Sequence, residues 1–321
     1  MTVLKLKQMI KHGLLKLKKH KFFSKLLKFS SLIVLAGIIF SCKTMSVAPS
    51  LNEVHPLDLL DEKSAFYIAV PSKADPELIS RVIKNNVPSL SDNDAKLIGE
   101  RLETVYLGLS HKKNLTSVQA AAKCDVPLKY IPKALNSKNG WTTESYSAKN
   151  GLRPYSIYKS DSIDICFPAS SRMLLGRDLP AMIDLYDELA WTPKNPSDSE
   201  DENFNTGLDK EIYQYLKGAE DEIRFFANQP QAFLSILMGS TLDLKLINVN
   251  GRMIVDEKHP QQYLVDINFE FKSAAILKAG KVLLKVAFGL TDADSKELSP
   301  TILSIKNIKI SKKQLYSLLL I

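Results

Sequence analysis

The amino-acid sequence predicts an α+β protein in which helices cover one face of antiparallel or mixed β-sheets. The clearest observation is the segment 263–272, where apolar and polar residues alternate with the period of two that is typical of a half-buried strand. Segments with helical spacing interrupt such strands. Near the C-terminus the resulting order is β-α-β-β-α-β, which favours helices packed on a sheet.

The first half of the chain opens with a strand and two helices. Residues 65–70 are apolar and predict a strand, and Asp75-Pro76 is a typical start for the helix that follows. Ser91 and Asp94 form a capping pair for a second helix over residues 91–102. Further strands are expected over residues 104–109, 117–126, 141–146, 155–158, 163–167 and 172–175, with helices at 128–135 and 178–190.

The second half begins with the same order of elements. Strands are expected over residues 222–227, 241–249, 263–272 and 301–310. Pro230 opens a helix after the first of them, and Asn250-Gly251 predicts a turn. Ser273 and Gly289 are typical caps of a helix between the last two strands. The two halves match in pattern and not in residues, which indicates a diverged duplication of one α+β unit.

A polar segment divides the two halves. Residues 192–207 are acidic and rich in proline, serine and asparagine, which is typical of a solvated linker or loop. We therefore expect a first α+β domain over residues 63–191 and a second over residues 208–321. The acidic run lacks the glycine and the ligand spacing of a calcium-binding loop, so no metal site is predicted there.

The first 41 residues have the composition of an export signal. Nine lysines and no acidic residue precede Phe29, and the 14 residues from Phe29 to Cys42 carry no charge. A helix needs about 20 apolar residues to span a bilayer. The uncharged run therefore has the length of a signal-peptide core and is too short for a membrane span.

The end of this run resembles the cleavage motif of bacterial lipoproteins. Ile39 stands three positions before Cys42, and Ser41 is the small residue that precedes the cysteine. Phe40 is typical of the relaxed, spirochaete-type form of the motif. The alternative is a general secretory signal followed by an ordinary cysteine.

The resemblance implies that residues 1–41 are a lipoprotein signal peptide and that Cys42 carries lipid, palmitate included. Each buried methylene contributes about 0.8 kcal/mol, so two or three acyl chains would make release from a bilayer negligible. The protein would then be lipid-anchored to a bacterial membrane in the cell envelope, on the extracytoplasmic side. Residues 42–62, which include Pro49 and Pro56, are expected to form an extended tether.

The leader accounts for the basic charge of the chain. The full sequence has 43 basic and 35 acidic residues and a net charge of +8. Without residues 1–41 it has 34 basic and 35 acidic residues, a net charge of −1. The mature protein therefore lacks the positive charge expected of a protein that binds nucleic acid.

Two further cysteines, Cys124 and Cys166, lie in the mature chain. An oxidising compartment could pair them, and the disulfide would close a loop of 43 residues. Cys124 continues the alternation of small residues Val118-Ala120-Ala122, which is typical of a buried thiol. Cys166 lies on the opposite face of its strand from Ile165 and Phe167. Two separate thiols are favoured over the disulfide, and both alternatives stay open.

No catalytic, cofactor-binding or metal-binding motif is found. The histidines outside the leader, His55, His111 and His259, do not have ligand spacing, and no glycine-rich phosphate loop is present. We therefore expect a non-enzymatic binding or scaffold module for an apolar ligand or an envelope protein. The alternative is an extracytoplasmic hydrolase assembled from separated loops, with Asp161, Asp164, His111 and His259 as the first suspects.

Two groups of apolar residues have alternative interpretations. Trp141 and the tyrosines Tyr146, Tyr155 and Tyr158 could line a ligand groove, although packing in a core is the commoner use of such residues. Residues 314–321 are mostly apolar, and we expect them either to complete the core or to contact a membrane or a partner.

Overall fold

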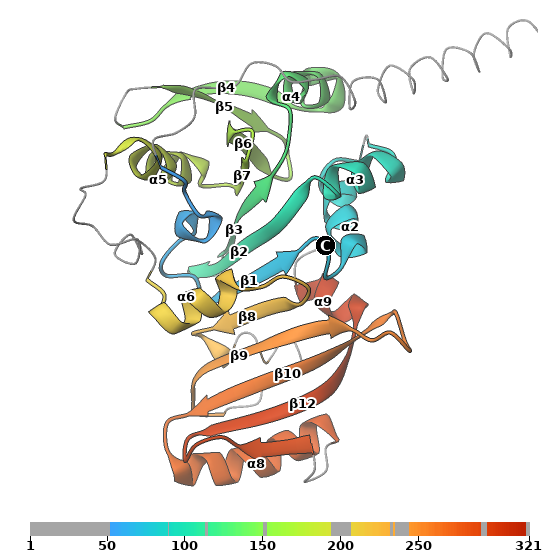
Figure 1. The fold of residues 1–321 in the computed structure, drawn as a ribbon, viewed down its shortest axis with the longest axis vertical. Coiled ribbons are helices and arrows are strands. Elements are labelled where there is room, and N and C mark those ends of the chain that lie inside the picture. Colours follow the sequence, from blue (N-terminus) through green and yellow to red (C-terminus); the bar gives the residue numbers. More distant parts are fainter. Residues whose placement is uncertain are drawn as a thin grey trace, which may run out of the picture. The chain divides into compact units, whose positions relative to one another are not determined.

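One antiparallel sheet carries every strand that this computed structural model describes (Figure 1). The described residues are 52–88, 90–112, 115–149, 153–193, 207–231, 234, 244–289 and 294–318. The strands are β1 (Phe66–Pro71), β2 (Leu102–Lys112), β3 (Leu115–Cys124), β4 (Thr142–Ser147), β5 (Pro154–Lys159), β6 (Asp164–Ala169), β7 (Arg172–Gly176), β8 (Ile223–Ala227), β9 (Leu246–Val255), β10 (Gln262–Phe271), β11 (Ser295–Glu297) and β12 (Ile302–Ser311). Their order in the sheet is β11-β12-β10-β9-β8-β1-β2-β3-β7-β6-β5-β4. The predicted α+β fold class is confirmed.

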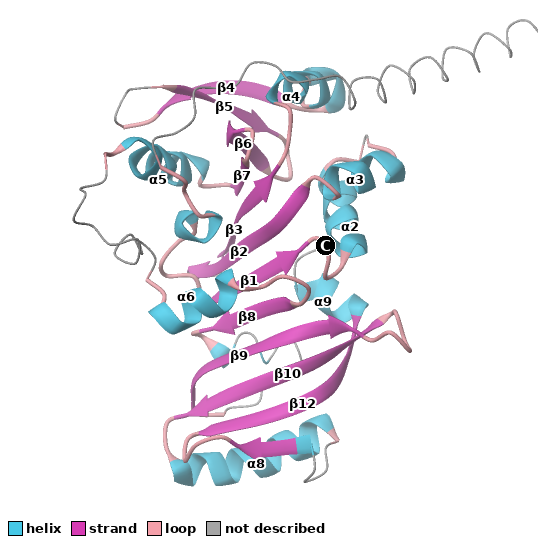
Figure 2. Ribbon diagram, in the orientation of Figure 1, coloured by secondary structure: helices cyan, strands magenta, loops and turns pink. Residues whose placement is uncertain are grey.

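The helices that follow Asp75, Ser91 and Ser273 begin at the caps that the sequence predicts (Figure 2). They are α2 (Pro76–Asn86), α3 (Asp92–Gly99), α4 (Ile131–Ala134), α5 (Leu179–Trp191), α6 (Lys210–Lys217), α8 (Ala274–Phe288) and α9 (Lys312–Leu318). The Asp75 carboxylate accepts a hydrogen bond from the amide of Leu78 at the start of α2. Ser91 and Asp94 form the predicted capping box of α3. The helix α8 ends at Gly289, whose φ of 63° lies in the left-handed region that favours glycine.

Strands β1 and β8 form the seam between the two halves of the chain. Phe66 pairs with Ala227, and Ala69 pairs with Arg224. The strands β1-β2-β3 continue the sheet on one side of this seam, and β8-β9-β10 continue it on the other. The predicted segments 63–191 and 208–321 therefore share one sheet within a compact unit of residues 49–321. Residues 194–206 of the predicted linker lie outside the described residues, and the duplication stays a prediction.

The sheet buries apolar side chains on both of its faces. All six residues of β1 are buried, and alternate residues of this strand belong to two different core clusters. One core contains side chains of α2, α8 and α9, and the other contains side chains of α5 and α6. The sequence predicts helices on one face. The structure places them on both, because a central strand that is apolar on both sides must be covered twice.

The expected turn at Asn250-Gly251 is wrong, because β9 runs straight through both residues. Asn250 pairs with Asn268 of β10, and the two side-chain amides share a hydrogen bond of 3.0 Å. A Cβ on Gly251 would lie 2.6 Å from the ring of Phe225 and would also meet the carbonyl of Asp266. The glycine therefore serves close packing between neighbouring strands and does not form a turn.

A buried ion pair fixes the C-terminal helix to the first half of the chain. Lys312 Nζ lies 3.0 Å from Asp75 Oδ2 and 3.3 Å from Glu77 Oε2. The Tyr263 hydroxyl donates a hydrogen bond to the same Asp75 carboxylate. Tyr316 is buried in the same core cluster as Leu315, so the interpretation that the C-terminal residues complete the core is confirmed for α9. Residues 319–321 lie outside the described residues.

The four aromatic residues proposed to line a groove instead pack on two faces. Trp141 and Tyr158 are buried in the core that contains α8, whereas Tyr155 is buried in the core that contains α5. Tyr146 packs against this second core and donates a hydrogen bond of 2.9 Å to Asp184. A single groove lined by these side chains is therefore not formed.

We predict that Gly251→Ala destabilises the fold by about 1–3 kcal/mol, the usual cost of overpacking a well-packed site. The added methyl group would displace Phe225 and the β10 backbone. Gly99→Ala is the control, because its nearest neighbour is the movable Ser80 hydroxyl and alanine favours the helix. Urea denaturation measures both variants. Equal stabilities would contradict the assigned role of Gly251.

Candidate functional site

The first described residues of the chain pack against the folded unit. The Asn52 side-chain amide donates hydrogen bonds to the carbonyls of Leu189 (2.9 Å) and Thr192 (2.7 Å), which lie at the C-terminal end of α5. Leu57 and Leu59 belong to a short 3-10 helix, Pro56–Leu59, and are only 1% exposed. The predicted tether of residues 42–62 is thus packed from Asn52 onward, and residues 42–51, Cys42 included, lie outside the described residues.

His55 lies at the centre of this packed segment. Its Nδ1 accepts a hydrogen bond of 3.2 Å from the amide of Leu57, and its ring packs against Tyr106 and Tyr213 with centroid distances of 5.1 and 5.8 Å. Burial, followed by the charges of Lys217 and Arg172, lowers the pKa of His55 to about 3. The ring is therefore neutral at physiological pH.

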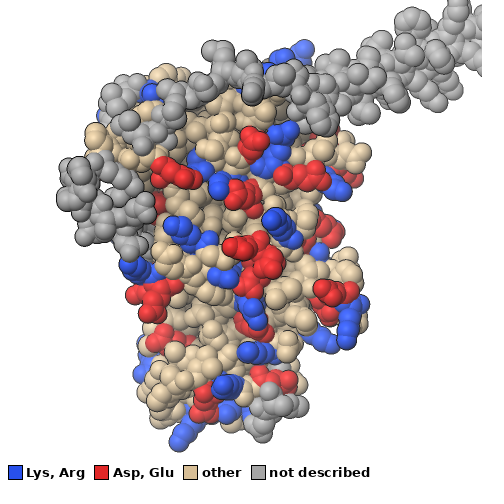
Figure 3. Space-filling model, viewed as in Figure 1, with Lys and Arg blue, Asp and Glu red and all other residues tan. Residues whose placement is uncertain are grey.

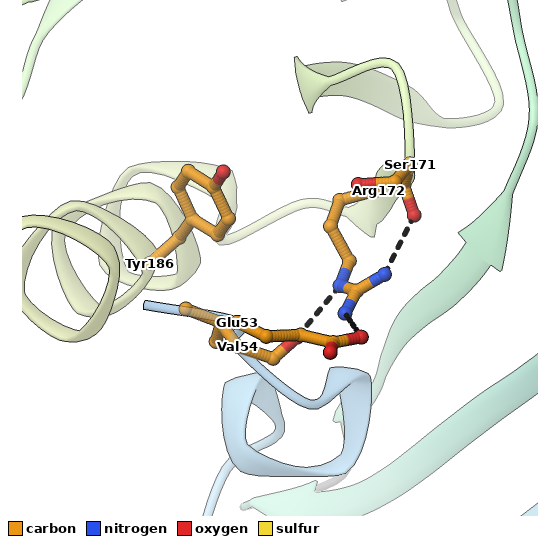
Figure 4. A pocket seen from close by; sticks show the side chains of 5 residues that line it. All are labelled: Glu53, Val54, Ser171, Arg172 and Tyr186. Atoms are coloured by element: carbon orange, nitrogen blue, oxygen red, sulfur yellow. Dashed lines mark hydrogen bonds and ion pairs between the residues drawn. The ribbon is translucent and has the colours of Figure 1, made fainter. Parts of the chain in front are cut away.

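Arg172 binds the same segment from β7 (Figure 4). Its Nε donates to the carbonyl of Val54 at 2.6 Å, and its Nη1 donates to the carbonyl of Ser171 at 2.8 Å. Its Nη2 donates to Glu53 Oε1 at 3.2 Å. The Arg172 side chain is 5% exposed, whereas that of Glu53 is 81% exposed. These four residues and Tyr186 line a pocket of about 190 Å³.

A second candidate surface is the outward face of α8. Leu277, Gly280 and Leu284 form the buried face of this helix. Val282, Leu283 and Val286 point outward and are 61%, 46% and 79% exposed. A surface helix normally presents polar residues to solvent. Successive exposed apolar turns therefore make this face a candidate interaction surface.

Basic residues accompany this apolar face. Lys278, Lys281 and Lys285 all belong to α8, and the helix contains no acidic residue. Lys281 forms an ion pair of 2.7 Å with Glu297 of the neighbouring strand β11. Acidic and basic side chains are interspersed over the face of the molecule that Figure 3 shows.

The suspects for a hydrolase do not come together. Asp164 begins β6 and pairs with Arg177 at 3.3 Å. Arg177 also donates a hydrogen bond to the backbone carbonyl of Asp161. His259 lies between β9 and β10, where it contacts Asp256 at 3.0 Å. His111 belongs to β2, which two strands separate from β6. Among the described residues, no three His, Cys, Asp or Glu side chains form a group that could hold a metal ion.

Cys124 and Cys166 are free thiols in the structure. They belong to different core clusters, on opposite faces of the sheet. Burial raises the pKa of each thiol to about 12. Both thiols are therefore protonated at neutral pH.

The comparisons with known proteins place the chain in a family. A family model described as outer membrane-associated lipoprotein TP0453 matches residues 52–316. The chain belongs to this family. It is thus a bacterial lipoprotein of the cell envelope and is associated with the outer membrane. None of the helices within the described ranges is long and apolar enough to cross a membrane.

Solved structures show the same fold. Crystal forms I, III and IV of TP0453 match with TM-scores of 0.61, 0.59 and 0.56, each at 17% sequence identity. The matches cover 83% of this chain and 97%, 98% and 97% of those chains. No curated protein matches the sequence.

Neither Arg172 nor the outward face of α8 was predicted from the sequence as a functional feature. The helix carried a signal, because Ala275, Ala279, Val282 and Val286 follow the spacing of three and four residues that marks one helix face. A second apolar stripe on a helix that already has a buried stripe predicts a further contact. Arg172 carried no such signal, since its partners Glu53 and Val54 lie more than 100 residues away in the sequence.

We predict that acid destabilises the packed N-terminal segment through His55. In the unfolded chain the pKa of histidine is about 6.5, so the unfolded state takes up the proton first as the pH falls. The stability due to neutral His55 is complete above pH 6.5 and is lost toward pH 3, by at most about 1.4 kcal/mol per pH unit. His55→Asn keeps an acceptor for the Leu57 amide and cannot titrate. Urea denaturation between pH 7 and 4 should show a shallower decline for this variant, and parallel declines would contradict the prediction.

We also predict that Cys124 and Cys166 react with an aromatic disulfide reagent at pH 8 only after unfolding, because buried protonated thiols are poor nucleophiles. A Cys42→Ser background removes the remaining cysteine from the count. Added to this background, Ser145→Cys on the exposed strand β4 is the positive control and should react in the native state. Two reactive thiols are expected in denaturant without reductant. Finding none would indicate a disulfide.

Proposed function

We propose that this lipoprotein is a non-enzymatic scaffold that docks on a lipid surface through the outward face of α8. The observation that carries the proposal is the exposure of Val282, Leu283 and Val286 on successive turns of one helix. The occupant is a membrane because the family is associated with the outer membrane. The lysines beside the apolar residues also match the composition of helices that lie in the membrane interface.

Docking through α8 needs no insertion of the sheet. An interfacial helix buries one apolar face in the boundary between headgroups and acyl chains, while the rest of the protein stays in water. Burying a valine or leucine side chain contributes about 1.5–3 kcal/mol. Three such side chains would together contribute several kcal/mol to the free energy of membrane binding. Lys278 and Lys285 would each add about 1 kcal/mol through attraction to anionic lipid.

The predicted lipid on Cys42 would make this docking efficient. Cys42 is ten positions before Asn52, which is held against α5, and an extended chain of that length spans at most about 35 Å. The folded unit would remain next to the bilayer that holds the lipid. The tether raises the effective concentration of α8 at that surface, so weak docking by the helix suffices.

The binding of an apolar ligand has less support. The pocket beside Arg172 has a volume of about 190 Å³ and a charged lining, whereas sites for apolar ligands are larger and mainly apolar. The hydrolase alternative has no group of converging residues to support it among the described side chains. We therefore favour a scaffold held at the membrane over a carrier or an enzyme.

We predict that Val286→Glu weakens binding to anionic vesicles by at least about tenfold, because a valine contributes about 1.5 kcal/mol when it is buried. The full chain is used in a Cys42→Ser background, so that lipid does not dominate the partition. Leu97→Glu is the control, since Leu97 is also an exposed apolar residue, at 41%, and lies on another helix, α3. Vesicle sedimentation measures the partition.

The proposal fails if Val286→Glu binds vesicles like the parent chain, or no more weakly than Leu97→Glu does. Binding of the parent chain to an envelope protein, lost in Val286→Glu while vesicle binding is unchanged, would assign the α8 face to a protein partner instead. Circular dichroism of each variant shows that the fold is retained.

A further inference from the structure

The pocket beside Arg172 has a charge arrangement that the proposed membrane docking does not use. The guanidinium is almost fully buried, yet among the described residues its only carboxylate partner is the exposed side chain of Glu53. Removing an ionic group from water is costly unless it is paired and hydrogen-bonded. A buried cation whose counter-ion can leave has the features of an anion-binding site.

We infer that this pocket binds a small carboxylate ligand, which takes the place of the Glu53 carboxylate on Arg172. Glu53 shows which chemistry the guanidinium accepts, because its Oε1 lies 3.2 Å from Nη2 in a single contact (Figure 4). A guanidinium presents a planar fork of N–H donors that can bind both oxygens of one carboxylate.

The backbone holds this fork in place. Nε is bonded to the carbonyl of Val54, and Nη1 is bonded to the carbonyl of Ser171. Arginine has five N–H donors, and the bonds to Val54, Ser171 and Glu53 use three of them. The plane of the guanidinium is therefore fixed before a ligand arrives, and donors remain for a second oxygen. Such preorganisation reduces the entropy that binding would otherwise cost.

The surroundings favour an anion. Lys217, Arg172 and Lys123 are close enough to His55, on the same packed segment, to help lower its pKa. The pocket volume of about 190 Å³ accommodates a small organic acid, and the ring of Tyr186 forms its opposite wall (Figure 4).

Displacement of Glu53 should be easy. Its side chain is 81% exposed, and an incoming carboxylate would pair with the buried guanidinium in its place, so Arg172 would not be left without a counter-ion. When Glu53 leaves, its carboxylate is solvated by water, while Arg172 keeps its two bonds to backbone carbonyls. The N-terminal segment would also stay packed, because Leu57 and Leu59 hold it in the core independently of Glu53.

Acetate tests the inference on the full chain in a non-ionic detergent, with ligand-observed saturation-transfer NMR at constant ionic strength. Wild type should bind acetate weakly. Glu53→Gln removes the competing carboxylate and should bind it about two- to fivefold more tightly, the range expected for the loss of an exposed ion pair. Glu100→Gln, a change of the same kind at an exposed residue outside the pocket, should bind like wild type.

Arg172→Gln should abolish the acetate signal. Because this variant removes a buried group and could fail to fold, the comparison of Glu53→Gln with Glu100→Gln decides the question by itself. Equal affinities of these two variants, or no acetate binding by Glu53→Gln, would overturn the inference. Binding of phosphate but not acetate by Glu53→Gln would overturn the assignment to a carboxylate.

Discussion

The pairing of β1 with β8 is the constraint on which the rest of the structure depends. Only four residue pairs join these strands, from Phe66 with Ala227 to Ala69 with Arg224, yet every other strand is attached to the sheet through one of the two. Because β1 is buried on both faces, each half of the chain must supply cover on each side. The seam therefore determines where the helices pack as well as the order of the strands.

The buried contact of Lys312 with Asp75 reinforces this seam from the end of the chain. Asp75 caps α2 in the first half, while Lys312 and Tyr263 come from the second half. A buried ion pair adds little net stability compared with apolar packing, but breaking it leaves an unpaired buried charge. It therefore specifies one arrangement of α2 and α9 and disfavours alternatives. The N-terminal segment has a similar role on the other face, where Asn52 binds the end of α5.

Local chemistry explains why much of the fold could be predicted from the sequence. The caps at Asp75, Ser91 and Ser273 and the alternation through β10 depend on neighbouring residues, and each was found where expected. Gly251 was misinterpreted because a glycine after asparagine is typical of a turn. Its actual reason, the ring of Phe225 on the adjacent strand, is a contact that the sequence does not display. The contacts of Arg172 were not predictable for the same reason, since its carbonyl partner Val54 is 118 residues away.

The helix α8 illustrates how the fold leaves a surface for function. Gly280 lets this helix approach the sheet, because a Cβ at that position would meet the ring of Phe271. The close approach buries Leu277 and Leu284 completely, so these two residues attach the helix to the core. Val282 and Val286 are then not required for packing within the folded unit. Exposed apolar side chains that the core does not need are unfavourable in water. Their contribution becomes favourable when another apolar phase covers them, and a lipid surface is the phase that we propose for this envelope protein.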